Sequence, residues 1–286
     1  MKTNLLLLDS YKNIESLLAF AFSFCNRFNR KLKIVYVFDL KWMSQSYMVG
    51  ATAPMDAGLA HAEKTAGEEF RIAKRKIRSV VDEYLKHNLV QMPHEIVTSQ
   101  VNRITLVEEE WKKDPDLMLL ASNHQSYAEL SGGLISHPNI IEHVKCPVFI
   151  IPENISHAVL KDVVYATDYN QEDITSLKHL SGFLKQAEHA RITVLHNAKD
   201  NSFDEKMKWK GFCEIVREEV GADDIDFVLE TQKDFFGGIE EYASNHNIDL
   251  LVLMHEKQGF FEQLFSSSEV KNVLTHFDKP VMVYHE

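Results

Sequence analysis

Short, nearly continuous apolar runs alternate with amphipathic stretches along the whole chain. In the first half the runs cover residues 4–8, 32–38, 95–98, 117–121 and 148–151, and in the second half residues 162–166, 191–196, 226–230, 250–254 and 281–284. Runs of this kind are typical of strands that are buried on both faces of a parallel sheet. We therefore predict ten strands, five in each half of the chain.

The stretches between the runs have helical periodicity. Residues 14–28 carry Leu17, Leu18, Ala21, Phe24, Cys25 and Phe28 at helical spacing, and the counterpart in the second half carries Leu177, Leu180, Phe183, Leu184 and Ala187. Strands that alternate with helices pair in parallel through right-handed crossovers. The pattern predicts an α/β fold with two tandem, doubly wound, five-stranded parallel sheets of the Rossmann-like type.

The two halves repeat one another at fixed offsets. The run Leu5-Leu6-Leu7-Leu8-Asp9 recurs as a strand ending in Asp168, an offset of 168 − 9 = 159, and the run that begins at Asp116 recurs at Asp249, an offset of 249 − 116 = 133. We predict two domains, 1–154 and 155–286. The extra length of the first lies within residues 39–94, as a loop over 43–58 and a charged, solvated helix over 63–87.

Composition and net charge limit the classes of function that the protein can have. The 286 residues are 45% apolar and 26% charged, as in ordinary globular proteins, and a net charge of −11 argues against nucleic acid or an anionic membrane as the partner. Three scattered cysteines make no disulfide framework or metal motif. The first apolar run is too short for a secretion signal, and no stretch reaches the roughly 18 apolar residues of a membrane span. We expect a cytoplasmic protein.

Two aspartates stand where a doubly wound fold binds its ligands. Asp9 and Asp168 follow the first strand of their halves, so both carboxylates would face the crevice at the carboxyl ends of the strands and accept hydrogen bonds from a ligand. The alternative is that they cap the helices that follow. Both interpretations stay open.

The order of these motifs resembles the universal stress protein family. The matching pieces, present twice, are the first strand ending in aspartate, a second strand that ends like Val194-Leu195-His196, a fourth strand that starts Asp-Leu, and a closing His-x-x-Cys/Lys-Pro-Val at His143 and His276. The resemblance covers essentially the whole chain. It implies the adenine nucleotide alpha hydrolase-like version of the Rossmann-like fold, and adenine placed near Asp9 or Asp168.

Nucleotide-binding members of that family carry G-x2-G-x9-G-[ST] after the fourth strand. The same spacing here gives Ala121, His124, Leu134 and Ile135 in the first half and Met254, Lys257, Ser267 and Ser268 in the second. All three glycines are replaced each time, and glycine is what lets a phosphate approach the backbone. The resemblance therefore implies a ligand site at Asp9, Asp168, His196, Met254, His255, Ser267 and Ser268, with no cofactor bound or an adenine nucleotide held weakly.

Three other patterns in the sequence have more than one interpretation. Ser131-Gly132-Gly133 resembles the start of a pyrophosphatase loop but lies after the wrong strand, so we predict a turn there. His196 and His255 could converge with Asp168 on a metal, but they lack a metal-ligand spacing, and we predict no metal site. Phe260, Phe261, Leu264 and Phe265 either pack in the core or plug the crevice and form a partner surface, and Phe235-Phe236 begins a helix.

The sequence supports no catalytic residue. We expect a non-enzymatic protein that acts in the stress response through conformational change or protein contacts, with ATP binding weak or lost. The alternative is a sensor that binds an adenine nucleotide or another metabolite in the second crevice; nucleotide hydrolysis is a third hypothesis. The partner would be a small molecule or a protein. The two domains are expected to pair through their last strands as an intramolecular pseudo-dimer, and a homodimer stays open.

Overall fold

The computed structural model describes most of the chain in two compact units. The described residues are 1–8, 10–11, 13–37, 55–89, 91–99, 112–113, 115–122, 140–141, 144–153, 155–186, 190–198, 200–221, 225–231, 235–255 and 277–285. Unit 1 comprises Met1–Cys146 and Ile151–Ala158, and unit 2 comprises Pro147–Ile150 and Val159–Glu286. The domain boundary placed between residues 154 and 155 stays a prediction.

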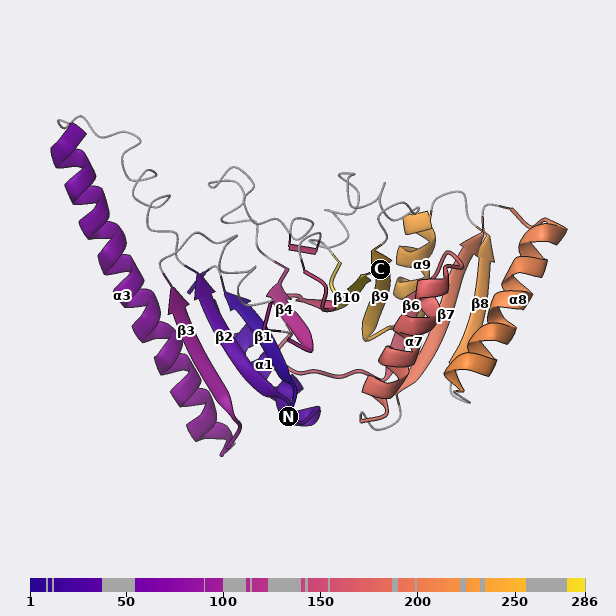
Figure 1. Cartoon of the computed structure of the whole chain (residues 1–286), viewed down its shortest axis with the longest axis horizontal. Helices are drawn as coiled ribbons and strands as arrows, with labels where there is room; N and C mark the ends of the chain where they lie inside the picture. Colours follow the sequence, from indigo (N-terminus) through magenta and orange to yellow (C-terminus); the bar gives the residue numbers. More distant parts are fainter. Residues whose placement is uncertain are drawn as a thin grey trace. The chain divides into compact units, whose positions relative to one another are not determined.

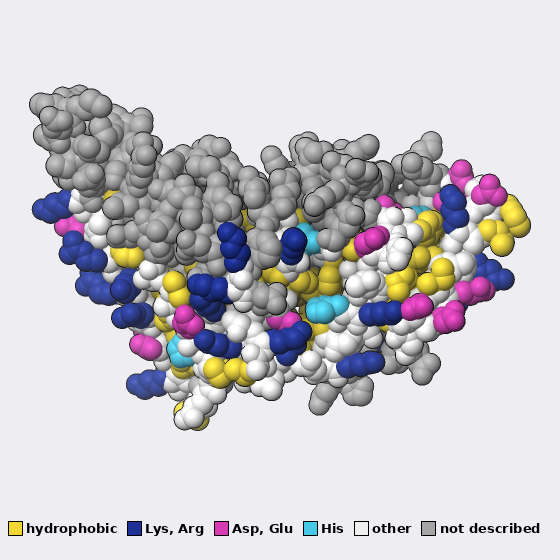
Figure 2. Space-filling view, viewed as in Figure 1, with side chains coloured by type: hydrophobic (Ala, Val, Ile, Leu, Met, Phe, Trp, Pro, Cys, Tyr) yellow, Lys and Arg dark blue, Asp and Glu magenta, His cyan; other side chains and the backbone are white. Residues whose placement is uncertain are grey.

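Unit 1 contains four parallel strands in the order β3-β2-β1-β4 (Figure 1). The strands are β1 (Thr3–Leu8), β2 (Lys31–Val37), β3 (His94–Ser99) and β4 (Leu117–Ala121), and the helices are α1 (Glu15–Arg27) and α3 (Met55–Asn88). Charged side chains, mostly lysine and arginine, follow the part of α3 that is not grey (Figure 2), as expected for a solvated helix. The loop predicted over 43–58 is wrong at its end, because Met55 already begins α3; residues 43–54 lie outside the described part.

Unit 2 contains six strands in the order β5-β10-β9-β6-β7-β8. They are β5 (Val148–Ile151), β6 (Asp162–Ala166), β7 (Arg191–Ala198), β8 (Ile225–Thr231), β9 (Leu250–His255) and β10 (Val281–His285), and the helices are α7 (Gln171–Leu184), α8 (Phe203–Val220) and α9 (Phe235–His246). All pairs are parallel except β5 with β10, which are antiparallel. The chain thus reverses its direction across the sheet after β8. Right-handed crossovers then place α7 and α8 on one face and α9 on the other.

The predicted α/β class and its mostly parallel, doubly wound strand order are confirmed. The prediction of five parallel strands in each half is wrong in one respect, because β5 pairs antiparallel with β10 and the strands divide as four and six between the units. All ten predicted strands are present, with bounds that differ by at most two residues, and the helices predicted over 14–28 and from Phe235 are α1 and α9. The two halves also share one register: Asn4 pairs with Leu117, and the residues at the offsets of 159 and 133, Val163 and Leu250, pair in the same way. The repeat is therefore structural as well as sequential.

The first helix of each half buries the same positions. Leu18, Ala21, Phe24 and Cys25 of α1 are buried, as are Leu177, Leu180, Phe183 and Leu184 of α7, each 159 residues later. Helical spacing puts all of them on the stripe that faces the sheet. The offset of 159 therefore relates equivalent positions through the strand, the turn and the helix.

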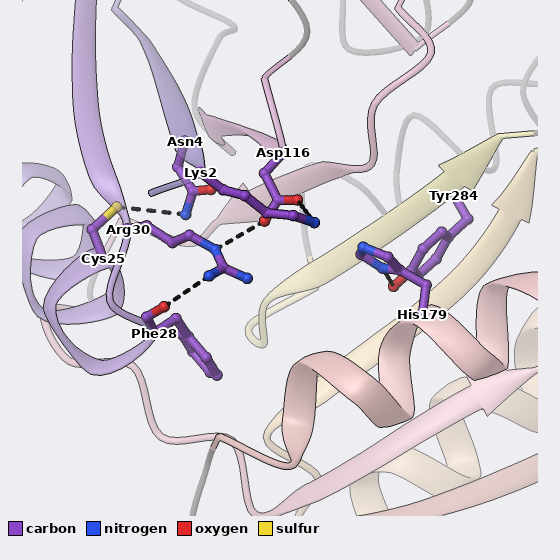
Figure 3. A network of polar contacts seen from close by, with 8 residues as sticks. All are labelled: Lys2, Asn4, Cys25, Phe28, Arg30, Asp116, His179 and Tyr284. Atoms are coloured by element: carbon purple, nitrogen blue, oxygen red, sulfur yellow. Dashed lines mark hydrogen bonds and ion pairs between the residues drawn. The ribbon is translucent and has the colours of Figure 1, made fainter.

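An aspartate ties the amino ends of the central strands together in both units. The Asp116 N–H donates to the Thr3 carbonyl at 2.8 Å, and its carboxylate pairs with Lys2 and with Arg30 Nε at 2.9 Å (Figure 3). At the equivalent place, Asp249 Oδ2 accepts from the backbone N–H groups of Lys161 and Asp162 at 2.9 and 3.1 Å. The same carboxylate position is thus satisfied by side chains in one copy and by the backbone in the other.

We expect Asp116→Ala to lower the free energy of unfolding by about 2 kcal/mol, because it leaves the largely buried Arg30 without its carboxylate. Urea denaturation measures the change. The control is Glu95→Ala, whose side chain is 44% exposed beside Lys31; that surface pair should contribute less than about 1 kcal/mol. Equal losses in the two variants would contradict the prediction.

Candidate functional site

The strand order of unit 2 places a crevice at the carboxyl ends of β6 and β9. From β6 the chain moves outward through β7 to β8, and then returns to β9 on the other side of β6. In open α/β sheets, ligands bind where the strand order reverses in this way. Of the predicted site residues, Asp168 follows β6, His196 lies in β7, and Met254 and His255 end β9.

The turn between β6 and α7 consists of four residues held by their own side chains. Asn170 is the N-cap of α7, and its Nδ2 donates to Asp168 Oδ1 at 2.6 Å. The Tyr169 N–H donates to Thr167 Oγ1 at 3.0 Å, and Tyr169 has a φ of +75°, in the left-handed region. The N-cap residue is thus Asn170, and Asp168 binds its side chain. Asp168 orients the capping residue.

A fully buried carboxylate, Asp173, lies directly beneath this turn. Its Oδ1 accepts from the Tyr165 hydroxyl at 2.6 Å, and its Oδ2 accepts from the Thr167 hydroxyl at 2.6 Å and the Asn170 N–H at 3.1 Å. Asp173 is the third residue of α7, so its bond to the N-cap is one half of a capping box. The carboxylate thus joins the strand, the turn and the helix.

Burial dominates the acidity of this group. Desolvation, with a smaller contribution from the Asp168 charge, raises the pKa of Asp173 from 3.8 to about 6, although the donors from Thr167 and Tyr165 act in the opposite direction. Burial and the Asp173 charge also raise the pKa of Tyr165 well above its ordinary value. Tyr165 therefore stays a hydrogen-bond donor, and Asp173 can change its charge near neutral pH.

His196 is held against the same turn from β7. Its Nδ1 lies 2.7 Å from the Thr167 carbonyl, which can only accept, so Nδ1 carries the proton. Burial lowers the pKa of this imidazole below 6.5, which keeps it neutral at pH 7. In the neutral ring with a protonated Nδ1, Nε2 is an acceptor.

Aromatic rings cover His196. The Tyr169 ring lies 3.8 Å from the His196 ring between centroids, and Trp209 of α8 lies 6.0 Å from Tyr169 and 6.1 Å from His196. Phe212 approaches Tyr169 to 5.6 Å, and Phe227 of β8 meets Trp209 edge-on at 6.0 Å. Such contacts add stability beyond the area that they bury. The side of the crevice toward α8 is therefore filled by the protein's own rings.

The structure joins only part of the predicted site. His196 is bound to the carbonyl of Thr167, and Asp168 is the next residue in the same turn. Met254 is buried within the core, where its Sδ accepts from the Ser176 hydroxyl at 3.9 Å, so it packs beneath α7. The His255 backbone pairs with His285 in the sheet, and its side chain lies outside the described atoms. Asp9, Ser267 and Ser268 lie outside the described residues, as do Ser131-Gly132-Gly133 and the aromatic patch over 260–265.

The first copy has apolar residues at the described positions that correspond to this polar cluster. At the offset of 159, Tyr165, Thr167 and Asp173 correspond to Leu6, Leu8 and Ile14, which are buried at 0%, 2% and 2% exposure. Sequence reasoning missed Tyr165, Tyr169, Asp173 and Trp209. A signal was present: Asn170-x-x-Asp173 is a capping pattern, and aligning the copies exposes polar residues at positions that are apolar in the first.

Neither a metal centre nor a membrane span is found in the part of the chain that the structure describes. No three or more histidine, cysteine or acidic residues there are grouped so that they could hold a metal ion. No described helix is long and apolar enough to cross a membrane. The side chain of His255, one of the three ligands considered from the sequence, is not among the described atoms.

Comparisons with known proteins agree with the motif resemblance. Residues 215–285 match the model of the universal stress protein family. A universal stress protein from Archaeoglobus fulgidus DSM 4304 has the same fold over 100% of this chain and 96% of its own, with a TM-score of 0.64 and 14% identity. A putative universal stress protein from Pseudomonas aeruginosa UCBPP-PA14 matches 99% of this chain and 93% of its own, with a TM-score of 0.54 and 13% identity.

A functionally unknown protein from Pseudomonas aeruginosa PAO1 matches to the same degree, with a TM-score of 0.54 and 13% identity over 99% of this chain and 92% of its own. No curated protein matches the sequence. The motif resemblance is supported by the family match over residues 215–285, and the tandem α/β fold is confirmed along the whole chain by the structural matches. At these identities the structural matches show the fold alone.

We expect the stability of the protein relative to an Asp173→Asn variant to fall between about pH 4 and about pH 7. The unfolded carboxyl ionises near 3.8 and the folded one only near 6, so the folded state binds more protons across this window. The stabilisation is complete below the unfolded pKa and is lost as the pH rises through the folded one. The loss should reach up to about 3 kcal/mol in urea denaturation series.

The matched control is Glu95→Gln. Lys31 lowers the pKa of Glu95, so the protein should gain stability relative to this variant as the pH rises through the range of that carboxyl. Parallel pH profiles for the protein and Asp173→Asn would show that Asp173 does not titrate as described.

Proposed function

We propose that the chain is a non-enzymatic, cytoplasmic universal stress protein that acts in the stress response through conformational change or protein contacts, with ATP binding weak or lost in both halves. The observation that carries the proposal is that the ring of Tyr169 covers His196, directly beside Asp168, near which the family resemblance would place adenine. The family match supplies the stress-response class.

The phosphate side of the crevice supports the same proposal. The first glycine position of the family's nucleotide motif is taken by Met254, whose side chain is 1% exposed and packs beneath α7. A triphosphate needs backbone N–H groups that it can approach closely, and replacing the glycines of that motif removes the approach. Weak or absent nucleotide binding follows from these replacements.

The thiols also support a non-enzymatic role. Burial raises the pKa of Cys25 to about 12 and that of Cys213 to about 11. A thiol becomes a nucleophile as its thiolate, and neither of these is ionised near neutral pH. Both cysteines therefore act as apolar core residues.

Two features support a role in contacts. On α8, Phe203 is 75% exposed, Met207 is 52% exposed and Ile215 is 49% exposed, so this helix presents large apolar side chains to its surroundings (Figure 2). The last strands of the two repeats, β5 and β10, pair antiparallel, as they would in a dimer of separate domains. We propose an intramolecular pseudo-dimer on that basis.

Calorimetric titration with ATP, ADP and AMP tests the nucleotide proposal. We expect no binding in the micromolar range for the purified protein, because the stacking position is filled and the glycines are absent. A micromolar dissociation constant for ATP would reject the proposal.

A second candidate function is a small-molecule sensor in the crevice of unit 2. It is favoured by the buried polar cluster around Asp173, which has no equivalent in the first copy, where Leu6, Leu8 and Ile14 occupy the same positions. A carboxylate whose pKa is raised by burial, as that of Asp173 is, is a candidate for a functional role. An adenine nucleotide or another metabolite would then bind through Asp168, His196, His255 and Ser268.

Native mass spectrometry of protein purified without added ligand separates the two candidates. If the sensor is correct, a small molecule should co-purify and should be lost in Asp168→Ala. The interaction protein should show the mass of the bare chain in both forms.

A further inference from the structure

Tyr169 combines two unfavourable features in one residue. Its φ of +75° is in the left-handed region, which bulky aromatic residues rarely adopt. Its hydroxyl is buried and has no hydrogen-bond partner among the described residues. Strained backbone persists where surrounding structure enforces it, and it concentrates at functional positions. A buried hydroxyl without a partner also loses its hydration.

The surroundings of the ring show what holds Tyr169 in place. Its N–H is bound to Thr167 Oγ1, and Thr167 is itself bound to the buried Asp173. Its ring packs on His196 at 3.8 Å and also contacts Trp209 at 6.0 Å. The aromatic contacts and the turn therefore offset the strain and the unpaired hydroxyl.

A hydrogen-bond acceptor lies on α8, one helical turn before Trp209, whose ring contacts that of Tyr169. Glu205 Oε2, in the first turn of α8, is also buried without a partner among the described residues. Burial and the negative charge of Glu205 raise the pKa of Tyr169. The two groups therefore interact electrostatically, although no hydrogen bond joins them. A planar ring in this place would thus find stacking partners on His196 and Trp209 and a carboxylate for a ring-bound donor.

We infer that Tyr169 is a built-in occupant of the second crevice, and that its removal opens a site for a planar aromatic ligand with a hydrogen-bond donor. The inference rests on the proposed function, since it explains how the crevice is closed to nucleotides. The ligand class is that of a phenol or an amino-substituted heteroaromatic ring. Stacking on His196 and Trp209 supplies the affinity, and Glu205 Oε2 accepts from the donor.

The first copy has different residues at the equivalent positions. At the offset of 159, Tyr169 corresponds to Ser10, since 169 − 159 = 10. Tyr36 pairs with Leu8, and it therefore stands in the first copy at the place that His196 takes beside Thr167 in the second. The ring of Tyr36 stacks on Phe70 of α3 at 6.4 Å. An aromatic ring that reaches the crevice from this turn is therefore a feature of the second copy.

The test removes the ring and restores it with a free ligand. We expect Tyr169→Gly, which also relieves the left-handed strain, to bind 4-methylphenol, the side chain that was deleted, with a saturable rise in Tm. Adenosine, which carries no phosphate, should bind this variant at least about tenfold more tightly than it binds the unaltered protein in calorimetric titration. Tyr169→Phe keeps the ring and should bind neither probe.

The matched control is Tyr242→Gly. Tyr242 of α9 also stacks on a histidine, His246, at 4.0 Å, but it lies away from the crevice. Binding to Tyr169→Gly and not to Tyr242→Gly supports the inference. A folded Tyr169→Gly that responds to the probes no better than the control overturns it.

Asparagine tolerates the left-handed region, so Tyr169→Asn repeats the test if the glycine variant does not fold. If neither ring-deleted variant folds, the ring is an essential part of the core and the inference is overturned. Failure of the proposed function can be distinguished from failure of this inference. Tight nucleotide binding by the unaltered protein rejects the proposed function, whereas a folded Tyr169→Gly variant that binds neither probe rejects only the role of Tyr169.

Discussion

A carboxylate that is removed from water needs donors, and the turn between β6 and α7 is shaped by supplying them to Asp173. The Tyr165 hydroxyl reaches it from the strand, the Thr167 hydroxyl from the start of the turn, and the Asn170 N–H from the helix end. Once Thr167 is fixed in this way, its carbonyl receives His196 and its hydroxyl receives the Tyr169 N–H. The positions of the Tyr169 and His196 rings are therefore linked to this buried carboxylate through Thr167.

The two copies show how one scaffold can hold different interiors. Parallel strands covered on both faces require apolar side chains along their length, and the shared register of β1 with β4 and of β6 with β9 preserves that requirement. Three buried positions nevertheless differ between the copies: the first copy has leucine or isoleucine there, and the second has polar residues that are hydrogen-bonded to one another. Such a change is tolerated only when all members are satisfied together, since a partly satisfied set is worse than an apolar core.

The strands were predictable because burial on both faces leaves an almost unbroken apolar run, as in 117–121 and 250–254. The doubly wound order followed from the family resemblance and from crossover handedness. The location of Asp168 and His196 at the same edge of the sheet was predictable, because each lies just after or near the carboxyl end of its strand. These inferences need only chain direction and periodicity.

The contents of the crevice were not predictable by those means. Tyr169 looks like an ordinary turn residue in the sequence, and only its left-handed backbone directs the ring onto His196. Trp209 lies in a separate helix whose contact with the turn depends on tertiary packing. Met254 was assigned to the site from spacing alone, and the structure shows that its side chain turns toward Ser176. Side-chain direction at the end of a strand is set by neighbours that periodicity does not reveal.

The antiparallel pairing of β5 with β10 has a practical consequence for dissecting the molecule. Val148, Phe149 and Ile150 belong to the second unit through Val283, Met282 and Val281, although they come from the first repeat. A fragment that starts after β5 would expose the unsatisfied backbone of β10 as a hydrophobic sheet edge, which invites self-association. A fragment that contains the second half should therefore begin at Pro147, so that it includes β5, the partner of β10.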